Sequence, residues 1–218
     1  KVQFDGKYYQ IPLPADKGTG LGKPLKLINH PVRDSIPIVI ASLGPKNVAL
    51  TAEIAQGWEP IFFHPEKAAS VWGDSLAEGK AKRDPALGEL DVYASPAVAI
   101  GDDADQFLPW IKPQLALYIG GMGAKGKNFY NDLAVRYGYE EEAEKIQDLY
   151  LAGKKEEATA AVPDELVRSI SLIGTESFVT ERLAAFRAAG ATTLNIHPIA
   201  SDSAGRVKQV ELLKSLIG

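Results

Sequence analysis

The sequence feature that most constrains the fold is an alternation of short apolar segments with longer helical patterns. The first apolar segment, Ile36–Ala41, is nearly continuous, which is typical of a strand buried on both faces of a sheet. A helix of small residues is predicted over Asn47–Gln56, and Gly57 is placed to end it. Trp58–Phe63 is then predicted to be a second strand.

The alternation continues after Pro65, a residue that suits the first position of a helix. Leu90–Ile100 is predicted to be a third strand, in which Pro96 indicates a bulge or a break. Asp102 is placed to cap a helix that runs towards Tyr118.

The same pattern returns in the C-terminal part of the chain. A helix is predicted over Glu176–Ala189, a fourth strand over Thr192–Ile196 and a closing helix from Val207 to Ile217. Four short buried strands that alternate with helices favour the α/β class with parallel pairing. Right-handed crossovers allow an open doubly wound sheet or part of a barrel. Because a complete barrel of this kind has eight strands, four strands would form about half of one.

The N-terminal region has a different character. Val2–Phe4 and Lys7–Ile11 flank Asp5-Gly6, which predicts a hairpin around a tight turn. A chain that begins one residue before a strand is typical of a fragment, so we expect a longer parent protein. The turn-rich stretch Pro12–Pro31 contains aliphatic residues throughout, which indicates a surface excursion rather than a linker. We therefore expect a single domain over residues 1–218.

Composition limits the classes of function. The 218 residues carry a net charge of −4, which gives no reason to expect nucleic acid or an anionic membrane as a partner. There is no apolar run long enough to span a bilayer. The absence of cysteine excludes thiol chemistry and fits a reducing compartment, so we expect a cytoplasmic protein.

Two segments could hold an anionic ligand. The first is Gly44, Pro45, Lys46 and Asn47, at the start of a predicted helix, where free N–H groups, the helix dipole and a lysine could hold a phosphate. A plain turn between strand and helix is the alternative interpretation. The second is the loop Gly120–Lys127, which could equally be a mobile solvated loop. Its residues that could contact a flat anionic ligand are Gly121, Met122 and Lys125.

Two histidines are candidate catalytic residues. His64 and His197 each follow a predicted strand and precede a proline, and barrel active sites lie at the carboxyl ends of the strands. Either could orient a substrate or take a proton, and ordinary capping or packing is the alternative. Neither has the local spacing of a metal site, so no metal is predicted. Glu59 lies within a predicted strand and could point into a pocket. The tryptophans are predicted to lie in the core: Trp58, Trp72 and Trp110.

Several segments together resemble the luciferase-like monooxygenase family. These are Ile38–Asn47, Glu53–Trp58, Leu117–Gly123, Leu172–Thr175 and Phe186–Gly190. The similarity covers nearly the whole chain. It is greatest to the actinobacterial branch that uses the deazaflavin coenzyme F420, and FMN is the alternative cofactor.

The resemblance implies an α/β (β/α)8 barrel of the TIM type, of which this chain would form strands five to eight. It also implies a helical insertion over residues 120–171 before the last strand. The cofactor would lie at the carboxyl ends of the strands, with Gly44–Asn47 near its phosphate, and hydride would pass between the deazaflavin and an organic substrate. The protein would supply orientation and electrostatics.

Four strands of such a barrel are absent from this sequence. We therefore expect the isolated chain to be inactive, and its strand edges to be covered by the missing segment or by self-association, such as a homodimer. The alternative to an enzyme is a binding protein: a non-catalytic half-barrel that binds a partner or an anion.

Overall fold

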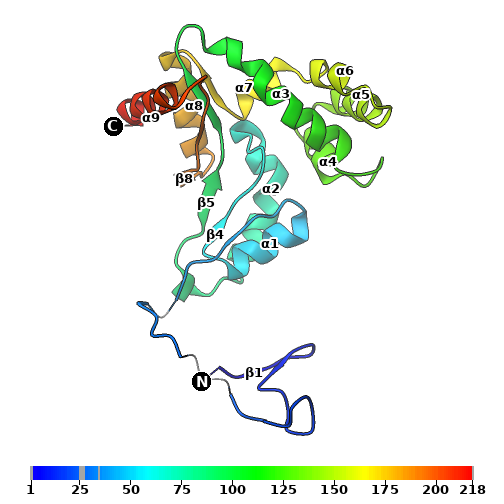
Figure 1. Ribbon diagram of the computed structural model, residues 1–218, viewed down its shortest axis with the longest axis vertical. Helices are drawn as coiled ribbons and strands as arrows, with labels where there is room; N and C mark the ends of the chain where they lie inside the picture. Colours follow the sequence, from blue (N-terminus) through cyan, green and yellow to red (C-terminus); the bar gives the residue numbers. More distant parts are fainter. Residues whose placement is uncertain (1, 25–27, 34, 218) are drawn as a thin grey trace. The chain divides into compact units, whose positions relative to one another are not determined.

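A computed structural model describes residues 2–24, 28–33 and 35–217, which form two compact units, Lys1–Ile36 and Pro37–Gly218 (Figure 1). In the first unit, β1 (Phe4–Asp5) pairs antiparallel with β2 (Gln10–Ile11), which confirms the hairpin. The predicted tight turn is wrong, because Asp5 pairs within the ladder and the Gly6 N–H donates to the Tyr9 carbonyl across a longer loop. Residues 25–27 of the predicted turn-rich stretch lie outside the described residues.

The second unit is built on parallel strands, which confirms the α/β prediction. One sheet has the order β3-β4-β5-β8 and another has the order β7-β6-β9, and every pairing in both is parallel. Among the described residues these sheets do not close into a complete barrel. Their strands are β3 (Val39–Ile40), β4 (Gly57–Trp58), β5 (Asp91–Ala94), β6 (Ala97–Ile100), β7 (Leu172–Gly174), β8 (Thr193–Leu194) and β9 (His197–Pro198).

The break predicted at Pro96 is present, because β5 and β6 are two parts of one extended segment separated by Ser95 and Pro96. The segment opposite is interrupted in the same way, and β5 pairs with β8 while β6 pairs with β9. Ser95 and Asn195 therefore lie at matching positions, where the ladder opens.

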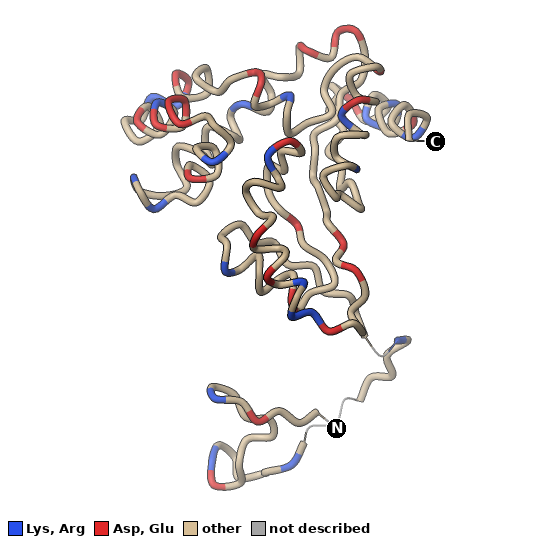
Figure 2. Tube along the Cα trace, turned by 180° about the vertical axis from the view of Figure 1, so that it is seen from behind, with Lys and Arg blue, Asp and Glu red and all other residues tan. Residues whose placement is uncertain are grey.

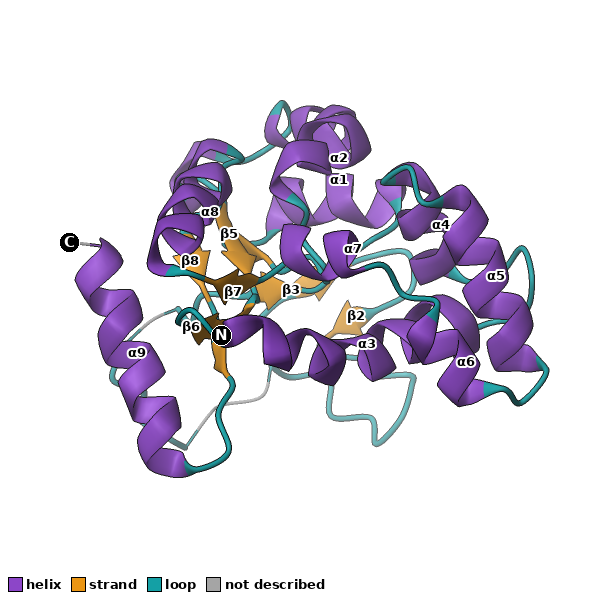
Figure 3. Ribbon diagram, turned by 90° about the horizontal axis from the view of Figure 1, so that it is seen from above, coloured by secondary structure: helices purple, strands orange, loops and turns teal. Residues whose placement is uncertain are grey.

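Helices surround the strands of the second unit. Figure 3 shows α1, α2 and α8 on one side of β3, β5 and β8, and α3 to α6 grouped elsewhere. The four helices α4 to α7 occupy the segment predicted as an insertion. The helices are α1 (Pro45–Ile54), α2 (Pro65–Lys80), α3 (Leu108–Ala116), α4 (Phe129–Arg136), α5 (Glu140–Leu151), α6 (Lys155–Ala160), α7 (Asp164–Ser169), α8 (Glu176–Ala188) and α9 (Ser203–Ile217), with 3-10 turns η1 (Pro85–Leu87) and η2 (Ala104–Phe107) and a π-helical turn η3 (Leu117–Gly121).

The single helix predicted from Asp102 is wrong in its details. The 3-10 turn η2 precedes α3. Asp103 occupies the N-cap position of η2, and no side chain makes a capping hydrogen bond there. Pro109 suits the first turn of a helix, and α3 accordingly begins at Leu108. The last turn widens into the π-helical turn η3, a form that is frequent at functional sites.

The core is built around aromatic side chains. Trp58 and Trp72 are each 1% exposed, as predicted, and their rings meet edge to face with centroids 5.2 Å apart. The prediction for Trp110 is wrong, because this residue of α3 is 58% exposed; its ring meets the Phe107 ring in a T-shaped arrangement. In α1 the buried residues are small ones, including Val48, and this allows a close approach to α2.

Charge is distributed without segregation. Figure 2 shows basic and acidic residues interspersed along the helices of the second unit. Within the part of the chain that the structure describes, no helix is both long and apolar enough to cross a membrane. No group of three or more potential metal ligands occurs in those residues either.

Candidate functional site

A cavity of about 580 Å³ opens at the carboxyl ends of the parallel strands. This volume lies within the range of small-molecule sites, and the carboxyl ends of the strands are where active sites of α/β barrels lie. Each of β3, β4, β5 and β8 is followed by residues that line the cavity, and α3 forms part of another wall. The lining residues are Ala41, Glu59, Pro60, Ile61, Phe62, Ser95, Ala97, Ile111, Gln114, Ile170, Ser171, Asn195, His197 and Ile199.

The carboxylate of Glu59, which follows β4, is held in this cavity by residues that follow two other strands, β5 and β8. The Ser95 hydroxyl donates to Glu59 Oε1 over 2.9 Å, and the Asn195 amide donates to the same oxygen over 3.2 Å. Glu59 Oε2 has no hydrogen-bond partner among the described residues. One oxygen therefore fixes the side chain, and the other remains available to a ligand.

The remaining lining is largely apolar. Ile61 and Phe62 follow β4, Ile111 projects from α3, and Ile199 follows β9. The Phe62 ring meets the Tyr118 ring of η3 edge to face, with centroids 5.4 Å apart. An apolar cavity with a few converging polar groups is the usual form of a site for an organic ligand.

The loop before α1 is fixed by two core indoles. Trp58 Nε1 donates to the Ser42 carbonyl over 3.0 Å, and Trp72 Nε1 donates to the Leu43 carbonyl over 3.2 Å. The Ser42 hydroxyl also lies 2.9 Å from the Thr51 hydroxyl of α1. The loop that carries the predicted phosphate-binding residues therefore begins from a rigid base next to Ala41.

The predicted phosphate-binding segment forms the start of α1. Gly44 occupies the N-cap position with extended backbone, Pro45 follows it, and Lys46 and Asn47 complete the first turn. No acidic residue lies in that turn, so no carboxylate of the turn offsets the charge of its N–H groups and dipole. These features are compatible with an anion, and the binding of one stays a prediction.

The two candidate histidines lie in different places. His197 lines the cavity together with Glu59, whereas His64 occupies the N-cap position of α2 and faces a second pocket of about 750 Å³ that also contains Arg182. His64 lies too far past the end of β4 to join the cavity residues. The residue is 6% exposed, and burial lowers the pKa of His64 although Glu66 opposes this effect.

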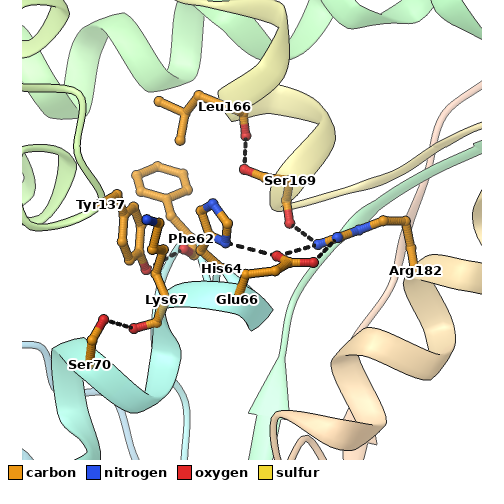
Figure 4. Close-up of polar contacts among 9 residues, drawn as sticks. All are labelled: Phe62, His64, Glu66, Lys67, Ser70, Tyr137, Leu166, Ser169 and Arg182. Atoms are coloured by element: carbon orange, nitrogen blue, oxygen red, sulfur yellow. Dashed lines mark hydrogen bonds and ion pairs between the residues drawn. The ribbon is translucent and has the colours of Figure 1, made fainter.

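The surroundings of His64 are shown in Figure 4. His64 Nδ1 lies 3.0 Å from Glu66 Oε2, but the direction does not satisfy a hydrogen bond, so we treat this contact as electrostatic. Arg182 of α8 pairs with Glu66 and donates to the Ser169 carbonyl at the end of α7. Burial alone would raise the pKa of Glu66, but the hydrogen bonds and charge of Arg182 hold it below its ordinary value. This cluster joins α2, α7 and α8, which gives it a structural role.

The glycine-rich loop does not line the cavity. A Cβ on Gly121 would lie 2.4 Å from the Tyr150 ring, so this glycine permits close packing of η3 on α5. Met122 is 49% exposed, and Lys125 forms an ion pair with Asp148. The cofactor role of Gly121, Met122 and Lys125 stays a prediction.

Sequence reasoning did not identify Ser95 and Asn195 as site residues. The available signal was a polar residue inside each of two predicted apolar strands, Leu90–Ile100 and Thr192–Ile196. In the structure these two residues directly follow β5 and β8, at the carboxyl ends where sites of α/β folds lie.

Parallel strands with a cavity at their carboxyl ends define a protein of the α/β class. The chain belongs to the luciferase-like monooxygenase family, whose family model matches residues 1–193.

The chain is 40% identical over 218 residues to a Mycobacterium tuberculosis protein whose name places it among the coenzyme F420-dependent oxidoreductases. It is 26% identical over 197 residues to the 5,10-methylenetetrahydromethanopterin reductase of Archaeoglobus fulgidus. These matches cover 99% and 88% of this chain, but only 61% and 53% of the two relatives.

A solved structure, the coenzyme F420-dependent tetrahydromethanopterin reductase from Methanopyrus kandleri, has the same fold with a TM-score of 0.66 and 22% identity. That match covers 97% of this chain and 56% of the reductase. The chain thus spans between half and two thirds of the length of the proteins that it matches.

Proposed function

We propose that this chain forms part of the site of a coenzyme F420-dependent oxidoreductase that transfers a hydride between the deazaflavin and a small organic substrate. The observation that carries the proposal is the mixed cavity at the carboxyl ends of the strands, where Glu59 is held by Ser95 and Asn195 between apolar walls. The names of the Mycobacterium tuberculosis and Methanopyrus kandleri proteins support the choice of cofactor.

The residues of the cavity fit such a cofactor. A deazaflavin ring is flat and mainly apolar with polar edges, and the cavity combines Ile61, Phe62 and Ile199 with a polar group centred on Glu59. When bound, the coenzyme supplies the carbon that accepts or donates the hydride. The start of α1, with Lys46, would hold the anionic tail, because its N–H groups are not capped by a side chain.

The residues of the chain would then orient the reacting partner. Glu59 Oε2 would accept a hydrogen bond from a hydroxyl or amine of the substrate, and His197 would lie beside it as a second polar contact. The apolar walls would exclude water from the ring. Each of these actions is one of binding and orientation, which is what a protein contributes to cofactor chemistry.

FMN is the alternative cofactor, because the family is that of luciferase-like monooxygenases. The absorption spectrum of a bound chromophore separates the two cofactors.

We also propose a small-molecule substrate and a homodimer in the cytoplasm. A half-barrel that only binds a ligand would show binding without turnover.

The experiment uses the full-length protein that contains this chain. We expect coenzyme F420 to bind, as seen by quenching of deazaflavin fluorescence, and reduced coenzyme to form with a substrate found by screening alcohols and related compounds. Glu59→Gln should lower kcat/KM by about ten- to a hundredfold, because a hydrogen bond to a charged group is worth about 1.5–3 kcal/mol.

Glu53→Gln, on α1 and absent from the cavity lining, is the matched control and should leave kcat/KM within about twofold of the wild type. Equal losses in both variants, or no binding of coenzyme F420, would overturn the proposal.

A further inference from the structure

Phe62 has a strained backbone in the wall of the cavity. Its φ angle is 51°, in the left-handed region, and among the described residues it is the one non-glycine residue with positive φ. A bulky residue in this region is a true outlier, and such strain persists only where the surroundings enforce it. Because Phe62 lines the cavity, whatever enforces this conformation also shapes the site.

A tyrosine from the helical insertion contacts this strained residue directly. The Tyr137 hydroxyl donates a hydrogen bond of 2.8 Å to the Phe62 carbonyl. Tyr137 follows α4 and is only 3% exposed, with its ring packed against His64 (Figure 4) and Trp72. Burial raises the pKa of Tyr137, so the hydroxyl keeps its proton and remains a donor at neutral pH.

The Phe62 side chain is held by the same insertion. Its ring meets Tyr118 of η3, and Tyr118 in turn meets Tyr130 of α4 edge to face, with centroids 4.8 Å apart. Asn128 fixes the base of this group, because its buried amide donates to the Tyr118 and Ile119 carbonyls and its oxygen caps α4. Backbone and ring of Phe62 therefore both depend on η3 and α4.

We propose that Tyr137 is a positioning residue, and that through it the helical insertion holds the β4–α2 loop in the strained form that completes the cavity wall. Tyr137 itself does not line the cavity. Its effect on a ligand passes through the Phe62 carbonyl and the loop of residues 59–64, which includes Glu59. The part of this inference that concerns catalysis rests on the proposed function, whereas the part that concerns the loop does not.

The first test is Tyr137→Phe, which removes the hydroxyl and keeps the ring. Loss of one hydrogen bond predicts a rise of about three- to tenfold in the KM for substrate or in the dissociation constant of coenzyme F420, with a smaller change in kcat. Tyr130→Phe is the control on α4, because no hydrogen bond of its hydroxyl occurs among the described residues; it should change neither value more than about twofold.

The second test asks whether Tyr137 acts through the strain. Glycine adopts positive φ without cost, so in a Phe62→Gly background the loop no longer needs the hydroxyl. The effect of Tyr137→Phe should then shrink to within about twofold, a non-additivity that a merely structural role would not produce. Equal effects of Tyr137→Phe in the two backgrounds would overturn the proposal.

The third test needs no cofactor. Hydrogen exchange of the peptide that spans residues 59–64 should be at least about threefold faster in Tyr137→Phe than in wild type or Tyr130→Phe. Unchanged exchange would refute the role of Tyr137. Faster exchange together with no binding of coenzyme F420 would uphold the loop contact and refute the proposed function instead.

Discussion

The contact between α1 and α2 offers a sharp test of the structure, because the two helices approach each other at a glycine. A Cβ added to Gly79 of α2 would lie 2.1 Å from the Ala49 carbonyl oxygen and 2.7 Å from the Ala52 Cβ. Both atoms belong to α1 and neither is the end of a flexible side chain. Gly79→Ala can therefore be accommodated only by moving one helix against the other.

The magnitude follows from two opposing terms. Overpacking of a buried site costs about 1–3 kcal/mol and occasionally more. Alanine gains at most about 1 kcal/mol over glycine inside a helix, and less near the end of α2 where Gly79 lies. Gly79→Ala should therefore lower the free energy of unfolding by about 2 kcal/mol.

Gly73 on the same helix is the matched control. A Cβ added there meets no atom within 4 Å, so Gly73→Ala should raise the free energy of unfolding by about 0.5–1 kcal/mol. Denaturant unfolding of both variants measures the difference, with equal m-values required for the comparison. Effects of the same sign in both variants would refute the packing of α1 on α2, and with it the placement of the two loops that these helices carry.

Three further predictions concern other parts of the second unit. Arg83→Lys should lower the free energy of unfolding by about 1–3 kcal/mol in denaturant titrations. The Arg83 guanidinium donates hydrogen bonds to the Ala52 and Ala55 carbonyls at the end of α1, and a lysine ammonium cannot reproduce this planar arrangement of donors. Since burial lowers the pKa of His64, the unfolded chain binds the proton more readily, and the free energy of unfolding should fall as the pH drops below 6.5. His64→Gln should make this fall less steep, and an unchanged pH profile in the variant would contradict the prediction. Trp110→Ala should cost less than about 0.5 kcal/mol by the same titration, and a core-sized loss would contradict its exposed position.

The order of strands and helices could be predicted from the sequence because it depends on local periodicity. The helix start at Pro65 and the break at Pro96 follow from the chemistry of proline. The strand β7 could not be predicted from the sequence, because its three residues follow polar helices and become a strand only by pairing with β6. Trp110 was misplaced because a large apolar side chain indicates burial only when its helix face is covered.

The site was less predictable because it depends on register between distant segments. Glu59 and His197 could be expected near a pocket, since Glu59 lies within a predicted strand and His197 directly follows one. The contact of Glu59 with Asn195 joins residues 136 positions apart, and no local pattern specifies it. His64 was expected near the same pocket because it follows the predicted strand Trp58–Phe63. In the structure it lies several residues past the end of β4, at the N-cap position of α2 and outside the cavity.

We propose that the cavity at the carboxyl ends of the strands receives the deazaflavin. A crystal structure of the full-length protein with coenzyme F420 bound tests it most directly. We expect the ring to lie in the cavity between Phe62 and Ile199, within contact distance of Glu59 or His197. A ring bound elsewhere, for example in the pocket of His64 and Arg182, would show that this cavity is not the deazaflavin site.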